Sequence, residues 1–107
     1  MKFRVRLTRE AQADLERLFD FVLERELARE GGAGDLDLAE QALAAIRAGI
    51  NTLQTSPFTC RKAGQSPFLR ELIIAFGRSG HVALFEIVGA SEVVVAAVRH
   101  QLESDYH

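Results

Sequence analysis

The second half of the chain carries three short apolar runs separated by breaks that contain glycine and serine. The runs are Phe68–Phe76, Val82–Val88 and Val93–Val98, and the breaks fall at residues 77–80 and 89–91. Runs of this length between turn-forming residues are typical of strands joined by hairpins. The pattern therefore predicts an antiparallel meander of three strands, around which the rest of the chain is organised.

Both faces of this meander are largely apolar, because residues of both parities in its first run are apolar. Such a sheet needs cover on one whole face and on part of the other. The upstream segments are expected to supply that cover. Function is then expected among the polar side chains that the meander leaves exposed, which are Arg70, Arg78, His81, Arg99 and His100.

The first half of the chain predicts one strand and two helices. Charged and apolar residues alternate over Lys2–Leu7, which indicates a half-buried strand. Apolar residues recur at helical spacing from Arg9 to about Glu30, and Thr8 is placed to cap that helix. The helix carries opposite charges three residues apart, as in the pair Asp14–Arg17.

A second helix follows the glycines at 31–34, with Asp35 or Asp37 as its cap and its end at about Gln54. Its apolar residues recur in steps of four and three, which suits packing against the first helix as an αα-hairpin. Residues 57–67 are then expected to form a loop with two adjacent cations, Arg61 and Lys62.

These elements predict an α+β fold with the order β-α-α-β-β-β, in which an antiparallel sheet has an αα-hairpin packed on one face. A chain of 107 residues is long enough for one domain, residues 1–107, and for one modest core. The core is expected to contain Leu15, Leu18, Phe19, Val22, Leu43, Ile46, Ile50, Leu72, Ile74, Leu84, Phe85, Val94 and Val98.

The composition of the chain indicates where in the cell the protein is expected. The 48% hydrophobic and 26% charged content is ordinary for a soluble globular protein. No apolar run is long enough to span a membrane, and the first residues do not form a signal peptide. With a single cysteine, Cys60, the chain cannot form an internal disulfide, so a cytoplasmic location without membrane contact is expected.

Charge and motif content exclude several kinds of ligand. The net charge is −2, which argues against nucleic-acid binding through bulk electrostatics. The three histidines lack metal-ligand spacing, and the glycines at 31–34 lack the preceding strand and the lysine of a phosphate-binding loop. We therefore expect neither a metal nor a cofactor.

Five segments in this order resemble the RelE/ParE superfamily, the small toxins of bacterial type II toxin–antitoxin systems. The resemblance covers essentially the whole chain. Its segments are residues 8–15 (TREAQADL), 56–57 (SP), 69–72 (LREL), 82–87 (VALFEI) and 95–100 (VAAVRH). The resemblance implies a toxin that helps to stabilise plasmids and that is bound in a hetero-oligomer by a cognate antitoxin.

The superfamily has two main branches, and the resemblance favours the ParE branch, which inhibits DNA gyrase. The RelE- and YoeB-like branch cuts mRNA on the ribosome and needs a base, an acid and cations. By alignment, the His and Tyr of a YoeB-like site fall on Gln101 and Leu102, and an expected arginine falls near Val82. A third strand that reads VALFEI is similar to ParE sequences.

Each reading has its own set of residues. A gyrase inhibitor is expected to bind its target through Arg70, Arg78, Arg99, His100 and Tyr106. In the alternative, a ribosome-dependent mRNA endoribonuclease would act on the ribosome and mRNA through Arg61, Lys62, Arg70, His81, Arg99 and His100. A non-toxic binding module of the same fold is the third hypothesis.

Ordinary structural roles stand beside these functional ones. Arg70 is as well explained by pairing with an acid on the sheet, and His81 by a place in a turn. Arg99 and His100 end a strand, where solvated polar residues are common. Arg61 and Lys62 are two cations in a loop, which is also common.

Overall fold

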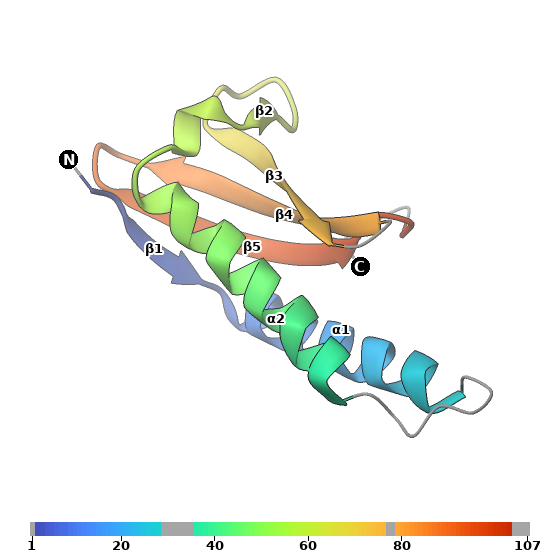
Figure 1. Cartoon of the computed structure of the whole chain (residues 1–107). Helices are drawn as coiled ribbons and strands as arrows, with labels where there is room; N and C mark the ends of the chain where they lie inside the picture. Colours follow the sequence, from blue (N-terminus) through green and yellow to red (C-terminus); the bar gives the residue numbers. More distant parts are fainter. Residues whose placement is uncertain (1, 29–35, 77–78, 104–107) are drawn as a thin grey trace.

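The computed structural model describes residues 2–28, 36–76 and 79–103, which form a helical layer and a sheet layer (Figure 1). The helices α1 (Arg9–Ala28) and α2 (Leu36–Asn51) pack side by side on one face of the sheet. The strands in the described residues are β1 (Arg4–Leu7), β2 (Arg61–Lys62), β3 (Leu69–Phe76), β4 (Ser79–Val88) and β5 (Glu92–His100). The expected α+β class, the element order and the αα-hairpin are confirmed, with the short strand β2 as an addition.

The sheet has the strand order β1-β5-β4-β3-β2. The meander β3-β4-β5 is antiparallel, as its hairpin breaks predict. The expectation of a wholly antiparallel sheet is wrong at one edge, where β1 pairs with β5 in parallel, with Val5 opposite Val93. No hairpin joins β1 to β5, because two helices and three strands lie between them, so the local pattern does not fix their relative direction.

The segment between the hairpin and the meander is more ordered than a loop. The helix α2 ends at Asn51 rather than Gln54, and a 3₁₀ turn, η1 (Thr52–Gln54), continues it. A second 3₁₀ turn, η2 (Pro57–Thr59), leads into β2, which pairs with β3. Asp37 lies inside the first turn of α2 and is not its cap, whereas Asp35 and the glycines at 31–34 lie outside the described residues.

The core lies between the hairpin and the sheet. The expected core residues Leu15, Leu18, Ile46, Ile50, Ile74, Phe85 and Val98 are buried. The others are half-buried: Phe19, Val22, Leu43, Leu72, Leu84 and Val94. The buried residues that complete the core include Ala11, Leu53, Ala83, Ile87, Val93 and Val95.

A β-bulge explains why Val94 is not in the core. Leu84 pairs with Ala97 whereas Phe85 pairs with Val95, so β5 has one extra residue between these two pairs. An extra residue reverses the alternation of side chains along the strand. Val95 and Val98 therefore point to the same face, although simple alternation would place them on opposite faces.

Neither α1 nor α2, the helices of the described residues, combines the length and the apolar character that a membrane span requires.

Candidate functional site

The end of β5 is closed by a turn that brings residues 101–103 back onto the strand. Arg99 Nη1 donates a hydrogen bond to the carbonyl oxygen of Glu103 at 2.6 Å and lies 3.3 Å from the carbonyl oxygens of His100 and Gln101. The backbone N–H of Leu102 donates to Nδ1 of His100 at 3.1 Å. Arg99 and His100 thus stabilise this turn, which we call the C-terminal turn.

Glu103 joins the C-terminal turn to α1. Its carboxylate pairs with Arg17 at 2.9 Å and accepts the backbone N–H of His100 at 3.1 Å. Burial alone would raise the pKa of the Glu103 carboxyl, but these hydrogen bonds and the Arg17 and His100 charges outweigh burial and lower the pKa. The turn is therefore held by an ionised carboxylate at neutral pH.

His81 and His100 lie face to edge beneath this turn. They are opposite each other on β4 and β5, their ring centroids are 5.5 Å apart, and their planes are perpendicular. Phe21 of α1 lies 6.2 Å from the His100 ring. Only 2% of His81 and 8% of His100 is exposed. The expectation that the sheet exposes these two histidines is wrong.

The physical reason lies in the strand register. Ala83 pairs with Val98 and His81 pairs with His100, so the two histidines share the helix-facing side of the sheet with the core residues. The bulge in β5 produces this arrangement, because it turns Val98 and His100 toward the helices. His81 accordingly lies within β4 rather than in a turn.

The chemistry of the histidine pair follows from burial. Within the described residues neither ring nitrogen of His81 has a hydrogen-bond partner. Burial, with a smaller contribution from His100 and against an opposing contribution from Glu103, lowers the pKa of His81 to about 4. In its neutral form His100 accepts the Leu102 N–H at Nδ1, so its own proton is on Nε2. His81 is therefore a neutral core group at neutral pH.

Arg70 holds the segment before β3 rather than pairing with an acid. It donates to the carbonyl oxygens of Pro67 at 2.7 Å, Phe58 at 3.0 Å and Cys60 at 2.7 Å. Its guanidinium also lies 5.3 Å from the centre of the Phe58 ring. Burial raises the pKa of the neighbouring Cys60 thiol, against an opposing effect of the Arg70 charge. Arg70 is half-buried, and its guanidinium is held by these three carbonyl oxygens.

Arg61 and Lys62 form the edge strand β2, and both are exposed. Arg61 pairs with Glu71 on β3 at 3.0 Å. The remaining expected target-binding residues, Arg78 and Tyr106, lie outside the described residues.

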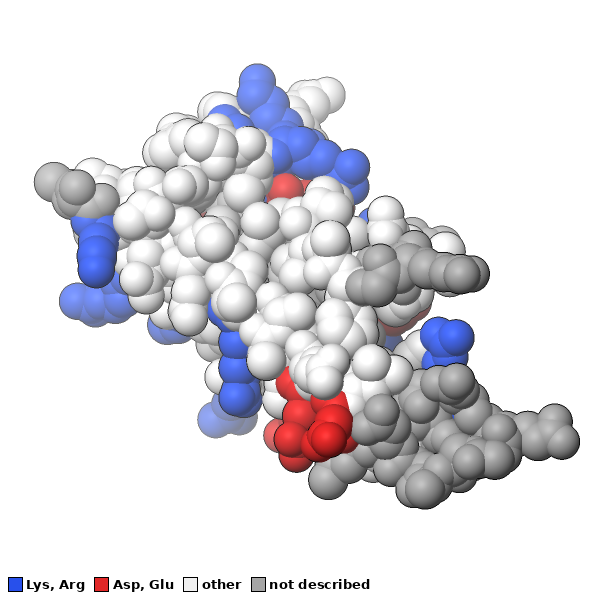
Figure 2. Space-filling model, in the orientation of Figure 1, with Lys and Arg blue, Asp and Glu red and all other residues white. Residues whose placement is uncertain are grey.

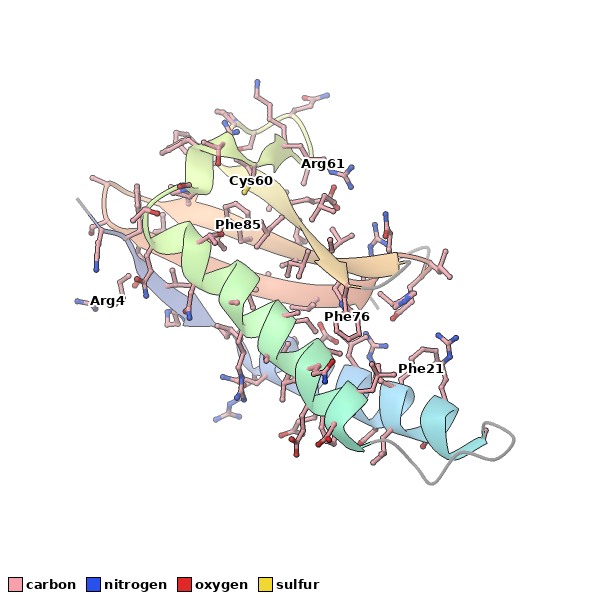
Figure 3. All side chains as sticks on the ribbon, in the orientation of Figure 1. Arg4, Phe21, Cys60, Arg61, Phe76 and Phe85 are labelled. Carbon is pink, nitrogen blue, oxygen red and sulfur yellow. The ribbon has the colours of Figure 1, made fainter. Side chains whose placement is uncertain are left out.

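The structure separates the expected site residues into two groups. His81, Arg99 and His100 lie where β4 and β5 meet the C-terminal turn, whereas Arg61, Lys62 and Arg70 lie at the other end of β3. Arg70 is opposite Phe85 and His81 is opposite Ile74. Four residues of strand therefore separate the two groups, which is about 13 Å. In Figure 3 Arg61 lies in the upper part of the view with Cys60, whereas Phe21, which contacts His100, lies on α1 at the lower right.

A third group of polar residues joins α1 to β5. The expected cap Thr8 and the expected pair Asp14–Arg17 are confirmed, but the sequence interpretation missed the contacts of Thr8 and Asp14 with β5. Asp14 is 3% exposed, and its Oδ2 accepts the backbone N–H of Val98 at 2.9 Å. The Thr8 hydroxyl donates to the carbonyl oxygen of Ala96 at 3.0 Å and caps α1 by accepting the N–H of Ala11. The signal in the sequence was the position of Asp14, which falls between Ala11 and Leu15 on the apolar stripe of α1.

A search for groups of three or more His, Cys, Asp and Glu side chains able to hold a metal finds none in residues 2–28, 36–76 and 79–103.

Comparison with known proteins gives three results. The family profile described as "ParE toxin of type II toxin-antitoxin system, parDE" matches residues 5–104. The protein "Toxin RelE1" of Caulobacter vibrioides is 30% identical over 103 residues, which cover 96% of this chain and 98% of that protein. A chain from the structure titled "Chromosomal ParDE TA system from P. aeruginosa" is similar in fold, with a TM-score of 0.70 and 20% identity, over 92% of this chain and 96% of that one.

The profile match extends from β1 to the C-terminal turn, so it includes every described element that positions the two groups of site residues. The order and packing of those elements agree with the ParDE structure. The chain belongs to the ParE toxin family of type II toxin–antitoxin systems.

Proposed function

We propose that this toxin inhibits DNA gyrase by binding to it, without a catalytic step of its own, and that a cognate antitoxin neutralises it in the cytoplasm. A gyrase inhibitor of this kind needs a stable surface and no general acid or base. The mRNA-cleaving alternative needs both of these groups within reach of a bound substrate.

The burial of the histidine pair carries this proposal. His81 and His100 are the histidines among the described residues, and both are buried. His100 contacts Phe21 of α1 and the C-terminal turn, and His81 contacts His100. A general base must come within hydrogen-bond reach of the proton that it removes. These imidazoles meet one another and the core instead, so neither is available to the 2′-hydroxyl of an mRNA in this arrangement.

The groups around the pair support the same interpretation. Gln101 and Leu102 occupy the positions of the YoeB-like His and Tyr, and Leu102 is 82% exposed. Neither side chain can transfer a proton. The Arg99 guanidinium binds three carbonyl oxygens of the C-terminal turn, which favours a structural role for it.

Ribosome-dependent mRNA cleavage is the second candidate function. It is supported by the exposed pair Arg61 and Lys62 and by the relative that carries the name Toxin RelE1. Two cations can bind phosphate, but the nearest histidines lie on the far side of a strand segment about 13 Å long. The geometry therefore favours binding over cleavage.

The antitoxin is expected to occupy the outer groove of the helical hairpin. A hollow of about 370 Å³ is lined there by Leu15, Glu16, Phe19, Asp20 and Leu43. An apolar floor between two helices is suited to an amphipathic helix or an extended segment. Such a partner would bury the half-exposed side chains that the sheet cannot cover.

The proposal is tested in cells that carry a reporter plasmid. Induction of the toxin should stop growth and leave the plasmid relaxed or linear, whereas ribosome-bound mRNA stays intact. Co-expression of the adjacent small open reading frame should restore growth. Growth arrest with a supercoiled plasmid and cut mRNA would support the second candidate, and no arrest at all would indicate a non-toxic binding module.

A further inference from the structure

Two exposed phenylalanines stand together at the end of the sheet next to β2. Phe58 is 50% exposed and Phe68 is 49% exposed, and their ring centroids are 6.4 Å apart. Phe3, which is half-buried, continues the row, with its centroid 6.4 Å from that of Phe58. We call Phe58, Phe68 and the edge residue Lys62 the aromatic surface. Apolar side chains that are exposed side by side, unlike ones scattered singly, form a candidate interaction surface.

The aromatic surface is held rigidly. Arg70 binds the carbonyl oxygens of Phe58, Cys60 and Pro67, and its guanidinium covers one face of the Phe58 ring. The 3₁₀ turn η2 and the pairing of β2 with β3 fix the rest of the segment. Side chains that are already ordered lose little conformational entropy when a partner binds. The rings are therefore prepared for a contact that residues 2–28, 36–76 and 79–103 of the toxin do not make.

The chain segment that carries these rings is basic. Residues 55–70 contain Arg61, Lys62 and Arg70 and no aspartate or glutamate. The neighbouring carboxylate, Glu71, is paired with Arg61. In Figure 2 one group of lysine and arginine atoms lies at the top of the view, where β2 lies, with a few carboxylate atoms beside it. Other basic groups lie at the left, below the centre and at the right, and the largest visible group of carboxylate atoms lies near the lower end of the helical hairpin. A partner that matches the aromatic surface would offer apolar side chains to the rings and carboxylates to the neighbouring cations.

A protein fits this surface better than a nucleic acid does. The rings of Phe58 and Phe68 meet at 73° and those of Phe3 and Phe58 at 65°, so they do not present parallel faces for successive bases. One face of Phe58 is already covered by Arg70. The net charge of −2 also opposes a polyanion. Aromatic centres with a polar border are, in contrast, the common arrangement of protein interfaces.

We propose that the aromatic surface is where the toxin contacts its cellular target, a protein that offers apolar side chains bordered by carboxylates. This rests on the proposed function in one respect only, that the chain acts by binding. It places the target contact at Phe58 and Phe68, away from the histidine pair and from the hairpin groove expected to hold the antitoxin.

The test compares Phe58→Ala, Phe68→Ala and Lys62→Glu with the matched control Ile73→Ala. Ile73 is 45% exposed and lies on the opposite face of β3. We expect each aromatic variant to need at least about tenfold more toxin to stop growth, as for a central interface residue. Ile73→Ala should remain as toxic as the wild type. Thermal melting and co-purification with the antitoxin should be unchanged in Phe68→Ala, because Arg70 binds the carbonyl oxygens of residues 58, 60 and 67 and the ring of Phe58. Lys62→Glu places a carboxylate opposite Arg70, so this variant is scored for toxicity only after its melting temperature is shown to equal that of the wild type.

Two results would overturn this inference. One is full toxicity in the folded variants Phe68→Ala and Lys62→Glu. The other is binding of a labelled single-stranded oligonucleotide by the wild type that is lost in Phe68→Ala, which would make the surface a nucleic-acid site. Inhibition of gyrase by the wild-type toxin is measured in a separate assay. If the wild type does not inhibit gyrase but the variants still lose toxicity, the proposed function is contradicted and the aromatic surface is supported as the contact with a different target.

Discussion

Asp14 and Val98 are bonded across the interface between α1 and β5: the Asp14 Oδ2 accepts the Val98 backbone N–H at 2.9 Å, in a buried position. The parallel strand β1 pairs with β5 only as far as Val95. Beyond that residue the backbone of β5 is bonded by side chains of α1 and its cap, including Arg17 to the Val98 carbonyl oxygen at 3.3 Å. The helix therefore completes the edge that β1 leaves open.

Asp14→Ala is expected to destabilise the protein by about 1–3 kcal/mol, because it leaves a buried N–H of β5 without its acceptor. The free energy of unfolding from urea titration at pH 7 measures this change. Asp14→Asn serves as the matched control, since its amide oxygen can still accept the bond, and it should lose less. Equal stability of the alanine variant and the wild type would show that the bond contributes nothing.

The sequence pattern was sufficient for the element order, because each helix and each strand of the meander has its own periodicity. The glycine and serine breaks predicted the hairpins that join β3, β4 and β5. The direction of β1 was not predictable from the same pattern, since Lys2–Leu7 alternates equally well in a parallel or an antiparallel pair. Its place beside β5 depends on contacts far apart in the chain.

The candidate site was predicted less well, and one feature explains most of the error. The bulge in β5 turns Val98 and His100 toward the helices, and no residue type in VVVAAVRH marks its position. His81 and His100 were consequently expected at the surface. Arg70 was expected to face a target, but its partners are carbonyl oxygens of residues 58, 60 and 67, which a side-chain pattern cannot reveal.

The histidine pair should make the fold sensitive to acid. The pKa of His81 is about 4 in the folded state, against an ordinary value of 6.5, so the unfolded chain takes up the proton first as pH falls. The stabilising contribution of neutral His81 is fully present above pH 6.5 and is lost as the pH falls toward 4. A shift of this size corresponds to about 3 kcal/mol. Urea unfolding at pH 7.5 and pH 4.5 measures the loss.

His81→Phe separates this effect from the titration of the carboxylates, Glu103 among them. The phenyl ring keeps the buried volume and the edge contact with His100 but takes up no proton. The variant should lose about 2–3 kcal/mol less than the wild type between the two pH values. If both proteins lose the same free energy of unfolding between pH 7.5 and pH 4.5, His81 is not the group that titrates.

Gly49 allows α2 to approach β3 closely. A Cβ atom at this position would lie 2.8 Å from Cγ1 and 3.2 Å from Cδ1 of Ile74. Gly49→Ala should therefore destabilise the fold, although alanine gains about 1 kcal/mol in a helix, because overpacking costs about 1–3 kcal/mol. In an Ile74→Ala background the same change should become stabilising. A double-mutant cycle of unfolding free energies tests this reversal, and additive effects would contradict it.

Arg70→Lys should loosen the segment 57–68 while the rest of the fold remains. A lysine keeps the charge but cannot reach three carbonyl oxygens with a planar group of donors. Hydrogen exchange of the backbone amides in that segment should speed up at least about tenfold, whereas the amides of α1 should stay protected. Arg61→Lys is the matched control, since Arg61 pairs with the single carboxylate of Glu71. Unchanged exchange in Arg70→Lys would show that Arg70 does not hold the segment.

We propose that this toxin acts by binding gyrase and not by cutting mRNA. The most direct measurement adds the purified toxin to DNA gyrase with relaxed plasmid and, in parallel, to ribosomes carrying a defined mRNA. Supercoiling should fall with toxin concentration, the antitoxin should restore it, and the mRNA should stay full length. Undiminished supercoiling together with mRNA cut on the ribosome would contradict gyrase inhibition and make this chain a ribonuclease.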